Sequence, residues 1–260
     1  MLLENKVALI TGASGGLGRA QALEYAREGA SLVLIDIKAD ELEETRQMIK
    51  ELGGEAIAVV ADISKKDEVQ NMVRQALDKF GKVDVCVNNA AVLLDFKALG
   101  DITEEEWDSV INVNLKGVYL ITHELLPHMM KQGTGTFINI SSASTFLAGA
   151  GDAAYMASKS AVNGIVKQLA YDYAIHGIRA VAIAPGLTDT PMVNHAIEQR
   201  HPQVIRQINN IPDGKIGTTE NVAYVSAFLA SDKVGSINGE IVKVDRGKTI
   251  GVQAKWVEID

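Results

Sequence analysis

Residues 7–18 read VALITGASGGLG and join a short apolar run to a turn with glycines at positions 12, 16 and 18. The apolar run is typical of a buried strand, and the following residues, Arg19 to Glu28, are typical of a helix. Glycines between a strand and a helix let the backbone approach a pyrophosphate, whose charge is stabilised by free N–H groups at the helix N-terminus. The segment therefore predicts a dinucleotide-binding unit. A tight turn that only packs helix against strand is the alternative.

The next apolar run ends at Asp36. An acidic side chain at the end of the second strand accepts hydrogen bonds from the adenosine ribose hydroxyls and repels a 2′-phosphate. This predicts NAD in preference to NADP. Lys38 is near enough in sequence to attract a phosphate, although a solvated surface lysine is the simpler interpretation.

Short apolar runs alternate with longer amphipathic segments along the whole chain. Because these runs are continuously apolar, they are typical of parallel strands covered on both faces. We predict an α/β fold with a single domain over residues 1–260, a Rossmann-like doubly wound sheet of about seven parallel strands with helices on both faces. Ser64, Thr103 and Thr218 are expected to begin helices. The predicted strands are Val7–Ile10, Leu32–Ile35, Ala56–Val60, Val83–Val87, Thr136–Ile140, Arg179–Ile183 and Glu240–Val244.

The composition excludes several classes of partner. A net charge of -8 and a pI near 5.2 disfavour nucleic acids and anionic membrane surfaces. The single cysteine, Cys86, lies in an apolar run and is predicted to be buried. No signal-peptide pattern and no apolar run of about eighteen residues occurs, so a cytoplasmic location is expected. His123, His128 and His176 lack partners at ligand spacing, and no metal site is predicted.

Three motifs follow one another in the chain: Thr11-Gly-x-x-x-Gly-x-Gly18, Asn88-Asn89-Ala90 and Tyr155-x-x-x-Lys159. Their order and spacing closely resemble the short-chain dehydrogenase/reductase family over nearly the whole chain. The resemblance implies that Tyr155 is the acid/base, that Lys159 holds the nicotinamide ribose and that Ser142 hydrogen-bonds the substrate oxygen. It also implies that Asn114 helps hold a water molecule on a proton path. Ser141 and Asn112 are the neighbouring rivals of Ser142 and Asn114.

The chemistry of the tyrosine and lysine fits these roles. Residues 153–174 are predicted to be helical, so Tyr155 and Lys159 share one face. A free tyrosine has a pKa near 10, and a nearby ammonium is expected to lower it by favouring the phenolate. Each catalytic residue also has an ordinary structural interpretation: an amphipathic pair for these two, a cap for Ser142 and a polar residue that bends its helix for Asn114.

The resemblance also implies a set of cofactor contacts at the ends of strands. Asp62 would lie beside the adenine, although a turn carboxylate is the alternative. Three residues depart from the commonest family pattern: Ala91 and Arg246 stand where glycine is usual, and Thr188 stands where an aliphatic residue is frequent. The implied contacts are Gly12, Ser14, Gly16, Leu17, Gly18, Asp36, Ile37, Asp62, Ile63, Asn89, Ala90, Tyr155, Lys159, Pro185, Gly186, Thr188 and Thr190.

The predicted function is NAD-dependent interconversion of a secondary alcohol and a ketone. Residues 188–217 correspond to the variable substrate lid, whose polar residues favour a small polar substrate such as a sugar, polyol or hydroxy acid. The alternative is that these residues, His195, Glu198, Arg200, His201, Arg206, Asn209 and Asn210, only face water.

Two other functions compete with this prediction. One is a noncatalytic dinucleotide-sensing or assembly protein, and the other is a 3-oxoacyl-thioester reductase, which would usually require NADPH. The resemblance implies a homotetramer, with a dimer as the second possibility. The partly apolar tail, residues 251–260, either docks on a neighbouring subunit or is frayed.

Overall fold

Seven parallel strands form one sheet in the computed structural model, which describes residues 1–94, 96–148 and 152–251. The strand order is β3-β2-β1-β4-β5-β6-β7, and every neighbouring pair is parallel. The predicted fold class is confirmed, and the tail lies outside the described residues from position 252 onward. The strands are β1 (Val7–Thr11), β2 (Ser31–Asp36), β3 (Ala56–Val60), β4 (Val85–Asn88), β5 (Gly135–Ile140), β6 (Ile178–Pro185) and β7 (Ile241–Val244).

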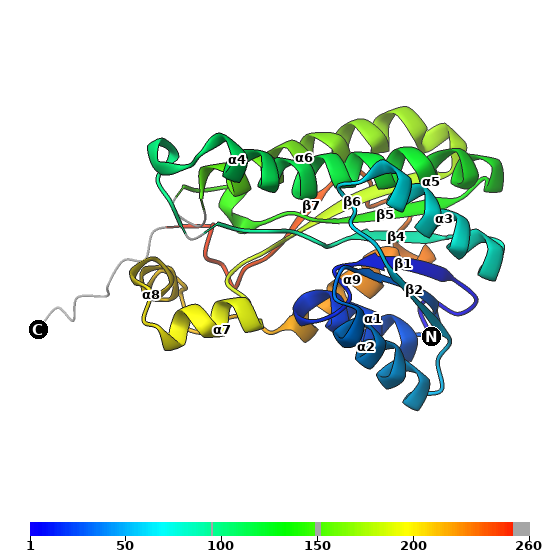
Figure 1. The fold of residues 1–260 in the computed structure, drawn as a ribbon, viewed down its shortest axis with the longest axis horizontal. Coiled ribbons are helices and arrows are strands. Elements are labelled where there is room, and N and C mark those ends of the chain that lie inside the picture. The colour runs from blue at the N-terminus through cyan, green and yellow to red at the C-terminus, as the bar shows by residue number, and fades with distance from the viewer. Residues whose placement is uncertain (95, 149–151, 252–260) are drawn as a thin grey trace, which may run out of the picture.

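Helices cover both faces of the sheet, with α3, α5 and α6 on one face and α1, α2 and α9 on the other (Figure 1). A π-helical turn at Asn112–Gly117 joins α4 to α5 without a break. No helix in the described part of the chain has both the length and the apolar character needed to cross a membrane. The helices are α1 (Gly16–Arg27), α2 (Ala39–Glu51), α3 (Lys66–Phe80), α4 (Glu104–Ile111), α5 (Val118–Gln132), α6 (Ala153–Tyr173), α7 (Pro191–Glu198), α8 (Pro202–Asn209) and α9 (Thr219–Ala230).

The core has one apolar layer on each face of the sheet. Successive residues of a strand point to opposite faces. In β1, Val7 and Leu9 therefore join the layer under α3 and α5, whereas Ala8 and Ile10 join the layer under α1 and α9. Cys86 is buried in β4, as predicted, and burial raises the pKa of its thiol.

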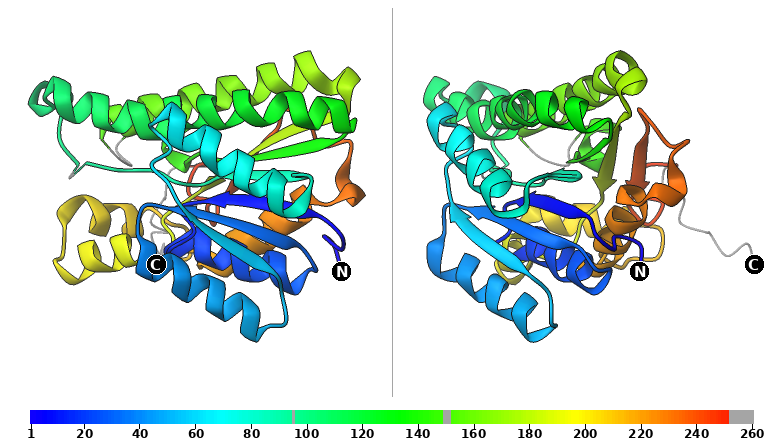
Figure 2. Two further views of the ribbon diagram at one scale, coloured as in Figure 1. Left: turned by 45° about the vertical axis from the view of Figure 1, so that its right-hand side comes forward. Right: turned by 90° about the vertical axis from the view of Figure 1, so that its right-hand side faces the viewer.

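The chain reverses its direction of travel across the sheet between β1 and β4. At such a switch point the loops after adjacent strands separate and leave a crevice at the carboxyl ends of the strands. Helices α7 and α8, coloured yellow, lie at this end of the molecule, whereas the N-terminus lies at the other end (Figures 1 and 2). The fold therefore brings the ends of distant strands together in one place.

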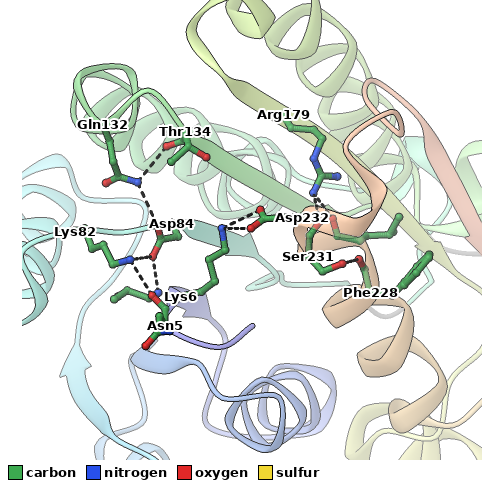
Figure 3. Close-up of polar contacts among 12 residues, drawn as sticks. Asn5, Lys6, Lys82, Asp84, Gln132, Thr134, Arg179, Phe228, Ser231 and Asp232 are labelled. Carbon is green, nitrogen blue, oxygen red and sulfur yellow. Dashed lines mark hydrogen bonds and ion pairs between the residues drawn. The ribbon is translucent and has the colours of Figure 1, made fainter. Parts of the chain in front are cut away.

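Polar contacts fasten the opposite, amino-terminal edge of the sheet (Figure 3). The buried Asp84 carboxylate accepts a hydrogen bond of 2.7 Å from the backbone N–H of Val7 and forms an ion pair of 2.9 Å with Lys82. Strand β4 begins at Val85, not at Val83 as predicted, although the backbone of Asp84 already donates to the carbonyl oxygen of Val7 and accepts from the N–H of Thr136, at 2.8 and 2.9 Å.

A buried arginine at the same edge completes the end of α9. The guanidinium of Arg179 donates hydrogen bonds to the carbonyl oxygens of Leu229 and Ser231, at 2.6 and 3.1 Å. The last carbonyls of a helix have no partner within it, so this contact satisfies them. Lys6 and Asp232 form an ion pair of 2.8 Å nearby (Figure 3).

Two of the three predicted helix starts are confirmed. Thr103 and Thr218 accept hydrogen bonds from backbone N–H groups in the first turns of α4 and α9. The prediction for Ser64 is wrong, because Lys65 occupies the cap position of α3. The Ser64 hydroxyl instead donates to the Asp62 carboxylate, at 2.7 Å, and stabilises the turn after β3.

Candidate active site

A cavity of about 830 Å³ opens at the carboxyl ends of the strands. This volume is in the range of pockets that enclose small ligands. Every residue predicted to contact the cofactor lines the cavity, and so does Ser142. The predicted residues on its wall are Gly12, Ser14, Gly16, Leu17, Gly18, Asp36, Ile37, Asp62, Ile63, Asn89, Ala90, Ser142, Tyr155, Lys159, Pro185, Gly186, Thr188 and Thr190.

The glycine-rich turn has a backbone that side chains would obstruct. Gly12 and Gly16 take φ values of +70° and +49°, in the left-handed region that favours glycine. A Cβ on Gly18 would lie 2.0 Å from the carbonyl oxygen of Gly12. Gly15 precedes α1 without a side-chain cap, so the first N–H groups of the helix stay available beside the cavity. This turn fits a pyrophosphate.

Asp36 is held in place at the end of β2. One carboxylate oxygen accepts a hydrogen bond from the backbone N–H of Ser14, at 3.2 Å, and the other accepts one from the N–H of Lys38, at 3.1 Å. The carboxylate is therefore fixed beside the glycine turn, where an adenosine ribose would lie. The Lys38 side chain also borders the cavity but is exposed to water.

Asp62 is engaged in a turn as well as lining the cavity. Its Oδ1 accepts from the backbone N–H and the hydroxyl of Ser64, at 2.9 and 2.7 Å. Burial raises the pKa of the Asp62 carboxyl, but these hydrogen bonds and the nearby Lys65 ammonium together outweigh burial and leave the pKa below its usual value. Its contacts are those of the turn carboxylate that the sequence left as an alternative.

The asparagine motif after β4 supports the glycine turn. The Asn89 side chain donates to the carbonyl oxygen of Thr11 at 2.9 Å, and the backbone N–H groups of Asn89 and Ala90 donate to the Thr11 hydroxyl at 3.1 Å. Ends of adjacent strands are thereby tied together at the switch point. The asparagine motif therefore holds the glycine turn against the end of β4.

The departures from the family pattern have different structural costs. Ala91 does not take a positive φ, so alanine causes no backbone strain there. Arg246 does take a positive φ, +52°, and forms an ion pair of 2.9 Å with Asp213. Thr188 is buried, and its hydroxyl donates to the carbonyl oxygen of Gly186 at 3.1 Å.

Helix α6 places Tyr155 and Lys159 on the cavity wall. The Asp152 carboxylate caps the helix by accepting from the backbone N–H of Tyr155, at 2.8 Å. Lys159 is only 2% exposed, and its Nζ donates to the carbonyl oxygen of Ile140 at 2.7 Å. The same Nζ lies 5.6 Å from the centre of the Tyr155 ring.

The structure overturns the expected effect of the lysine on the tyrosine. Burial raises the pKa of the Tyr155 phenol, a hydrogen-bonding interaction with Ser142 acts in the opposite direction, and the Asp152 charge raises it further. Burial also lowers the pKa of Lys159 to about 8. The prediction that Lys159 lowers the tyrosine pKa is wrong for this arrangement, because the loss of water around both groups is the largest effect. The Tyr155 interaction also favours Ser142 over its rival, Ser141.

Asn114 lies behind the cavity rather than on its wall. It is fully buried in the π-helical turn, whereas its rival Asn112 is partly exposed. The Asn114 amide bonds both backbone groups of Val92, at 2.8 and 2.9 Å, and donates to the Ser158 hydroxyl at 3.2 Å. Asn114 thus connects the loop after β4 to helix α6.

Comparisons with known proteins agree with this geometry. A family model described as enoyl-(acyl carrier protein) reductase matches residues 12–249. This chain belongs to the short-chain dehydrogenase/reductase family. The 3-oxoacyl-(acyl-carrier-protein) reductase of Thermotoga maritima is 38% identical over 252 residues, which cover 96% of this chain and 100% of that protein.

Solved structures of this family with either cofactor resemble the chain. The 3-ketoacyl-(acyl-carrier-protein) reductase of Brucella melitensis, complexed with NADH, has a TM-score of 0.86 at 34% identity and covers 95% of this chain and 99% of its own. The putative NAD(P)-dependent gluconate 5-dehydrogenase of Beutenbergia cavernae, with bound NADP, has a TM-score of 0.88 at 33% identity. The match covers 96% of this chain and 98% of that protein. The chain is therefore a family oxidoreductase built to bind a nicotinamide dinucleotide.

The polar residues of the family's lid segment do not form the cavity wall. His195, Glu198, Arg200, Arg206, Asn209 and Asn210 are exposed, and His201 stacks on Phe96 with ring centres 4.8 Å apart. Helices α7 and α8 instead turn apolar side chains, among them Val193 and Val204, toward the cavity. Six of these seven polar side chains therefore face water, which was the alternative interpretation of the polar lid segment.

Three polar residues on the wall were missed from the sequence, and Ser144, in the turn after β5, is one of them. Gln207 of α8 and Lys248 after β7 are buried and line the cavity. A signal existed for Lys248, because it follows the last apolar strand, whose carboxyl end meets the same edge as the others. Among the described residues, no group of three or more His, Cys, Asp or Glu side chains could hold a metal ion.

Proposed function

We propose that this chain is an NAD-dependent oxidoreductase that interconverts a secondary alcohol and a ketone on a small polar substrate. The observation that carries the proposal is that Tyr155, Ser142 and Lys159 line the same cavity as the glycine turn and Asp36. A proton-transfer group and a dinucleotide site in one cavity are what hydride transfer to a carbonyl requires. Residues 188–217 are proposed to act as the lid over the substrate.

The choice of NAD over NADP rests on Asp36. Its two oxygens are already anchored by backbone N–H groups, so the carboxylate cannot turn away from a 2′-phosphate without losing those bonds. A ribose hydroxyl in the same place would donate a favourable hydrogen bond. Similar structures have been solved with NADH and with NADP, so members of the family differ in the cofactor they bind.

The side chains define the proton chemistry. When bound, the nicotinamide supplies or accepts the hydride. Ser142 donates a hydrogen bond to the substrate oxygen, and Tyr155 gives its proton to that oxygen during ketone reduction or takes it during alcohol oxidation. Because burial raises the pKa of Tyr155, the phenol holds its proton at neutral pH and is prepared for reduction. Asn114 acts as a positioning residue through Val92 and Ser158.

A second candidate is reduction of a 3-oxoacyl thioester. The 38% identity to a 3-oxoacyl-(acyl-carrier-protein) reductase favours it, as do the apolar side chains that α7 and α8 turn toward the cavity. Asp36 favours the first candidate, because a thioester reductase of this kind usually requires NADPH. The two candidates share the catalytic residues and differ in cofactor and substrate.

We also propose that the chain assembles as a homotetramer, with a dimer as the second possibility. Large apolar side chains are exposed on and beside helices α5 and α6. They are Tyr119 on α5, Tyr171 near the end of α6, and Ile175 in the turn after α6; the last two are 84% and 87% exposed. Burial of such side chains against a second copy stabilises an assembly. Sedimentation analysis measures the state directly, and a monomer at micromolar concentration contradicts the proposal.

The test is nicotinamide absorbance with NAD⁺ or NADP⁺ against sugars, polyols, hydroxy acids, simple secondary alcohols and 3-hydroxyacyl thioesters. Tyr155→Phe is expected to lower kcat by about 10²- to 10⁴-fold, the usual contribution of a general acid/base, while NAD⁺ binding is retained. Tyr224→Phe, at a half-exposed position of α9, is the matched control and keeps full activity.

The outcomes separate the candidates. Turnover of thioesters with NADP⁺ supports the second candidate. Tight NAD⁺ binding without turnover of any compound supports a dinucleotide-sensing role. Full activity in Tyr155→Phe contradicts the catalytic assignment.

A further inference from the structure

A buried ammonium lies at the lid end of the cavity. Lys248 is only 4% exposed, and its Nζ donates a hydrogen bond of 2.8 Å to Oε1 of Gln207, which is 6% exposed. Both residues line the cavity that contains Tyr155. Burial lowers the pKa of Lys248, although the charge of Asp245 acts in the opposite direction.

The donors of this ammonium are mostly unused by the protein. An ammonium has three N–H donors, and the bond to Gln207 uses one. In the described part of the chain no carboxylate lies within 4.0 Å of Lys248 Nζ. Asp245, the acid nearest in sequence, accepts from the backbone N–H groups of Gly247 and Thr249 at 3.0 Å and from the Thr249 hydroxyl at 2.6 Å. A buried charge with no carboxylate in direct contact is costly, so an anion in the cavity would be favoured.

The other charged residues on the wall belong to other parts of the site. Asp36 and Asp62 follow β2 and β3, where the adenosine is proposed to bind, and Lys38 is exposed beside them. Lys159 is bonded to the end of β5 next to Tyr155. Lys248 is the remaining charge among the described wall residues, and its neighbours on α7 and α8 are largely apolar.

We propose that Lys248, together with Gln207, binds a carboxylate of the substrate, and that the substrate is therefore a hydroxycarboxylate or its oxo form. Charge-assisted hydrogen bonds from the ammonium and the Gln207 amide would hold this group. The apolar side chains Val193 and Val204 suit a hydrocarbon segment between the two polar ends better than a chain of hydroxyls.

The carboxylate takes no part in the redox step, and this inference rests on the proposed function of the same site. In oxidation the hydroxyl would give its proton to the phenolate form of Tyr155, and the carbinol carbon would lose a hydride, which a bound nicotinamide would accept. The product keeps the carboxylate and gains the ketone. The positive charge of Lys248 thus selects and orients the substrate without touching the reacting atoms.

The experiment measures binding to the NADH-saturated protein by calorimetry. The probes are 2-hydroxybutyrate, 3-hydroxybutyrate and 4-hydroxypentanoate, which place the hydroxyl at different distances from the carboxylate, each paired with its neutral amide. At least one acid is expected to bind at least tenfold more tightly than its amide. Lys248→Met is expected to weaken that acid by about 10- to 100-fold, the usual value of a hydrogen bond to a charged group, and to leave the amide unchanged.

Three variants complete the design. Lys248→Arg keeps the charge and retains most of the preference for the acid. Gln207→Glu places a carboxylate beside Lys248 and weakens the acid without removing the lysine. Lys215→Met removes an exposed lysine of the lid segment and, as the control for net charge, leaves the preference unchanged.

Each outcome decides the inference independently of turnover. No preference for any acid over its amide, or wild-type affinity for the acid in Lys248→Met, overturns it. Equal weakening of acid and amide in that variant also overturns it, because Lys248 would then only hold α8 in place. Acid binding to the NADH complex, with no oxidation of the same acid or of any other compound in the NAD⁺ assay, supports this inference and contradicts the proposed oxidoreductase, whereas turnover of neutral alcohols without an acid preference does the reverse.

Discussion

Replacing Gly18 by alanine tests whether the glycine turn is built for close backbone approach. The added Cβ would lie 2.0 Å from the Gly12 carbonyl oxygen, 2.6 Å from its carbon and 2.7 Å from the Asn89 side-chain nitrogen. Two of these atoms are backbone atoms of the turn itself, and the turn is tied to β4 through Asn89 and Thr11. Neither side of the contact can move alone, so the turn must shift as a whole.

The expected cost follows from this constraint. Overpacking of a fixed site costs about 1–3 kcal/mol, and the backbone contact places Gly18→Ala near the upper end, at about 3 kcal/mol in the free energy of unfolding. A similar loss in binding corresponds to roughly 100-fold weaker affinity for NADH.

Gly15→Ala is the matched control in the same loop. Nothing lies within 4 Å of a Cβ at Gly15, and its φ of -171° is ordinary extended backbone. Urea unfolding and NADH fluorescence titration measure both variants. If Gly18→Ala binds NADH like the wild type, or if Gly15→Ala loses as much affinity, the close-approach argument is refuted.

Three further predictions concern single charges. Asp36→Ala is expected to lower the preference for NADH over NADPH at least tenfold in fluorescence titrations, because the anchored charge that repels a 2′-phosphate is gone. An unchanged ratio of the two affinities would contradict the role of Asp36 in selecting NAD. Burial lowers the pKa of Lys159 to about 8, whereas an unfolded lysine has a pKa near 10.4. Between these values the folded state binds fewer protons than the unfolded state. The free energy of unfolding of the wild type should therefore rise with pH, by as much as about 3 kcal/mol up to pH 10.5. Lys159→Met should lack this rise in urea unfolding at pH 7.5 and 10, and identical pH dependence in both proteins would refute it. Asp84→Ala leaves the Val7 N–H unpaired and should cost about 2–4 kcal/mol in unfolding without changing NADH affinity, because it lies at the opposite edge from the cavity; weakened NADH binding would show that the two edges are coupled.

The fold was predictable because its main signal is local. Strands such as β1 and β6 are covered on both faces, so each reads as a continuous apolar run. The rule that ligands bind at the carboxyl ends of parallel strands then assembles residues as distant as Gly12, Asp36 and Thr190 into one site. Strand ends were less predictable, because the apolar run Val83–Val87 begins before the pairing of β4 with β1, which starts at Val85.

The lid shows where composition misleads. The number of polar residues in α7 and α8 does not say which of their side chains point toward the cavity. The buried residues of α8 and the turn after it are Val204, Gln207 and Ile211, at the spacing of one helical face. This periodicity would have placed Gln207 inward and Arg206 outward, and would have identified the polar contact that composition missed.

The tyrosine shows where pairwise reasoning fails. A lysine one helical turn away from Tyr155 was expected to favour the phenolate, as it would in water. In the folded protein both groups lose water, and this loss lowers the pKa of Lys159 while it raises that of Tyr155. The order of the groups along the helix was visible in the sequence, but the desolvation that decides their charges depends on everything packed around them. A buried phenol that keeps its proton is in the form that can donate it to a ketone oxygen.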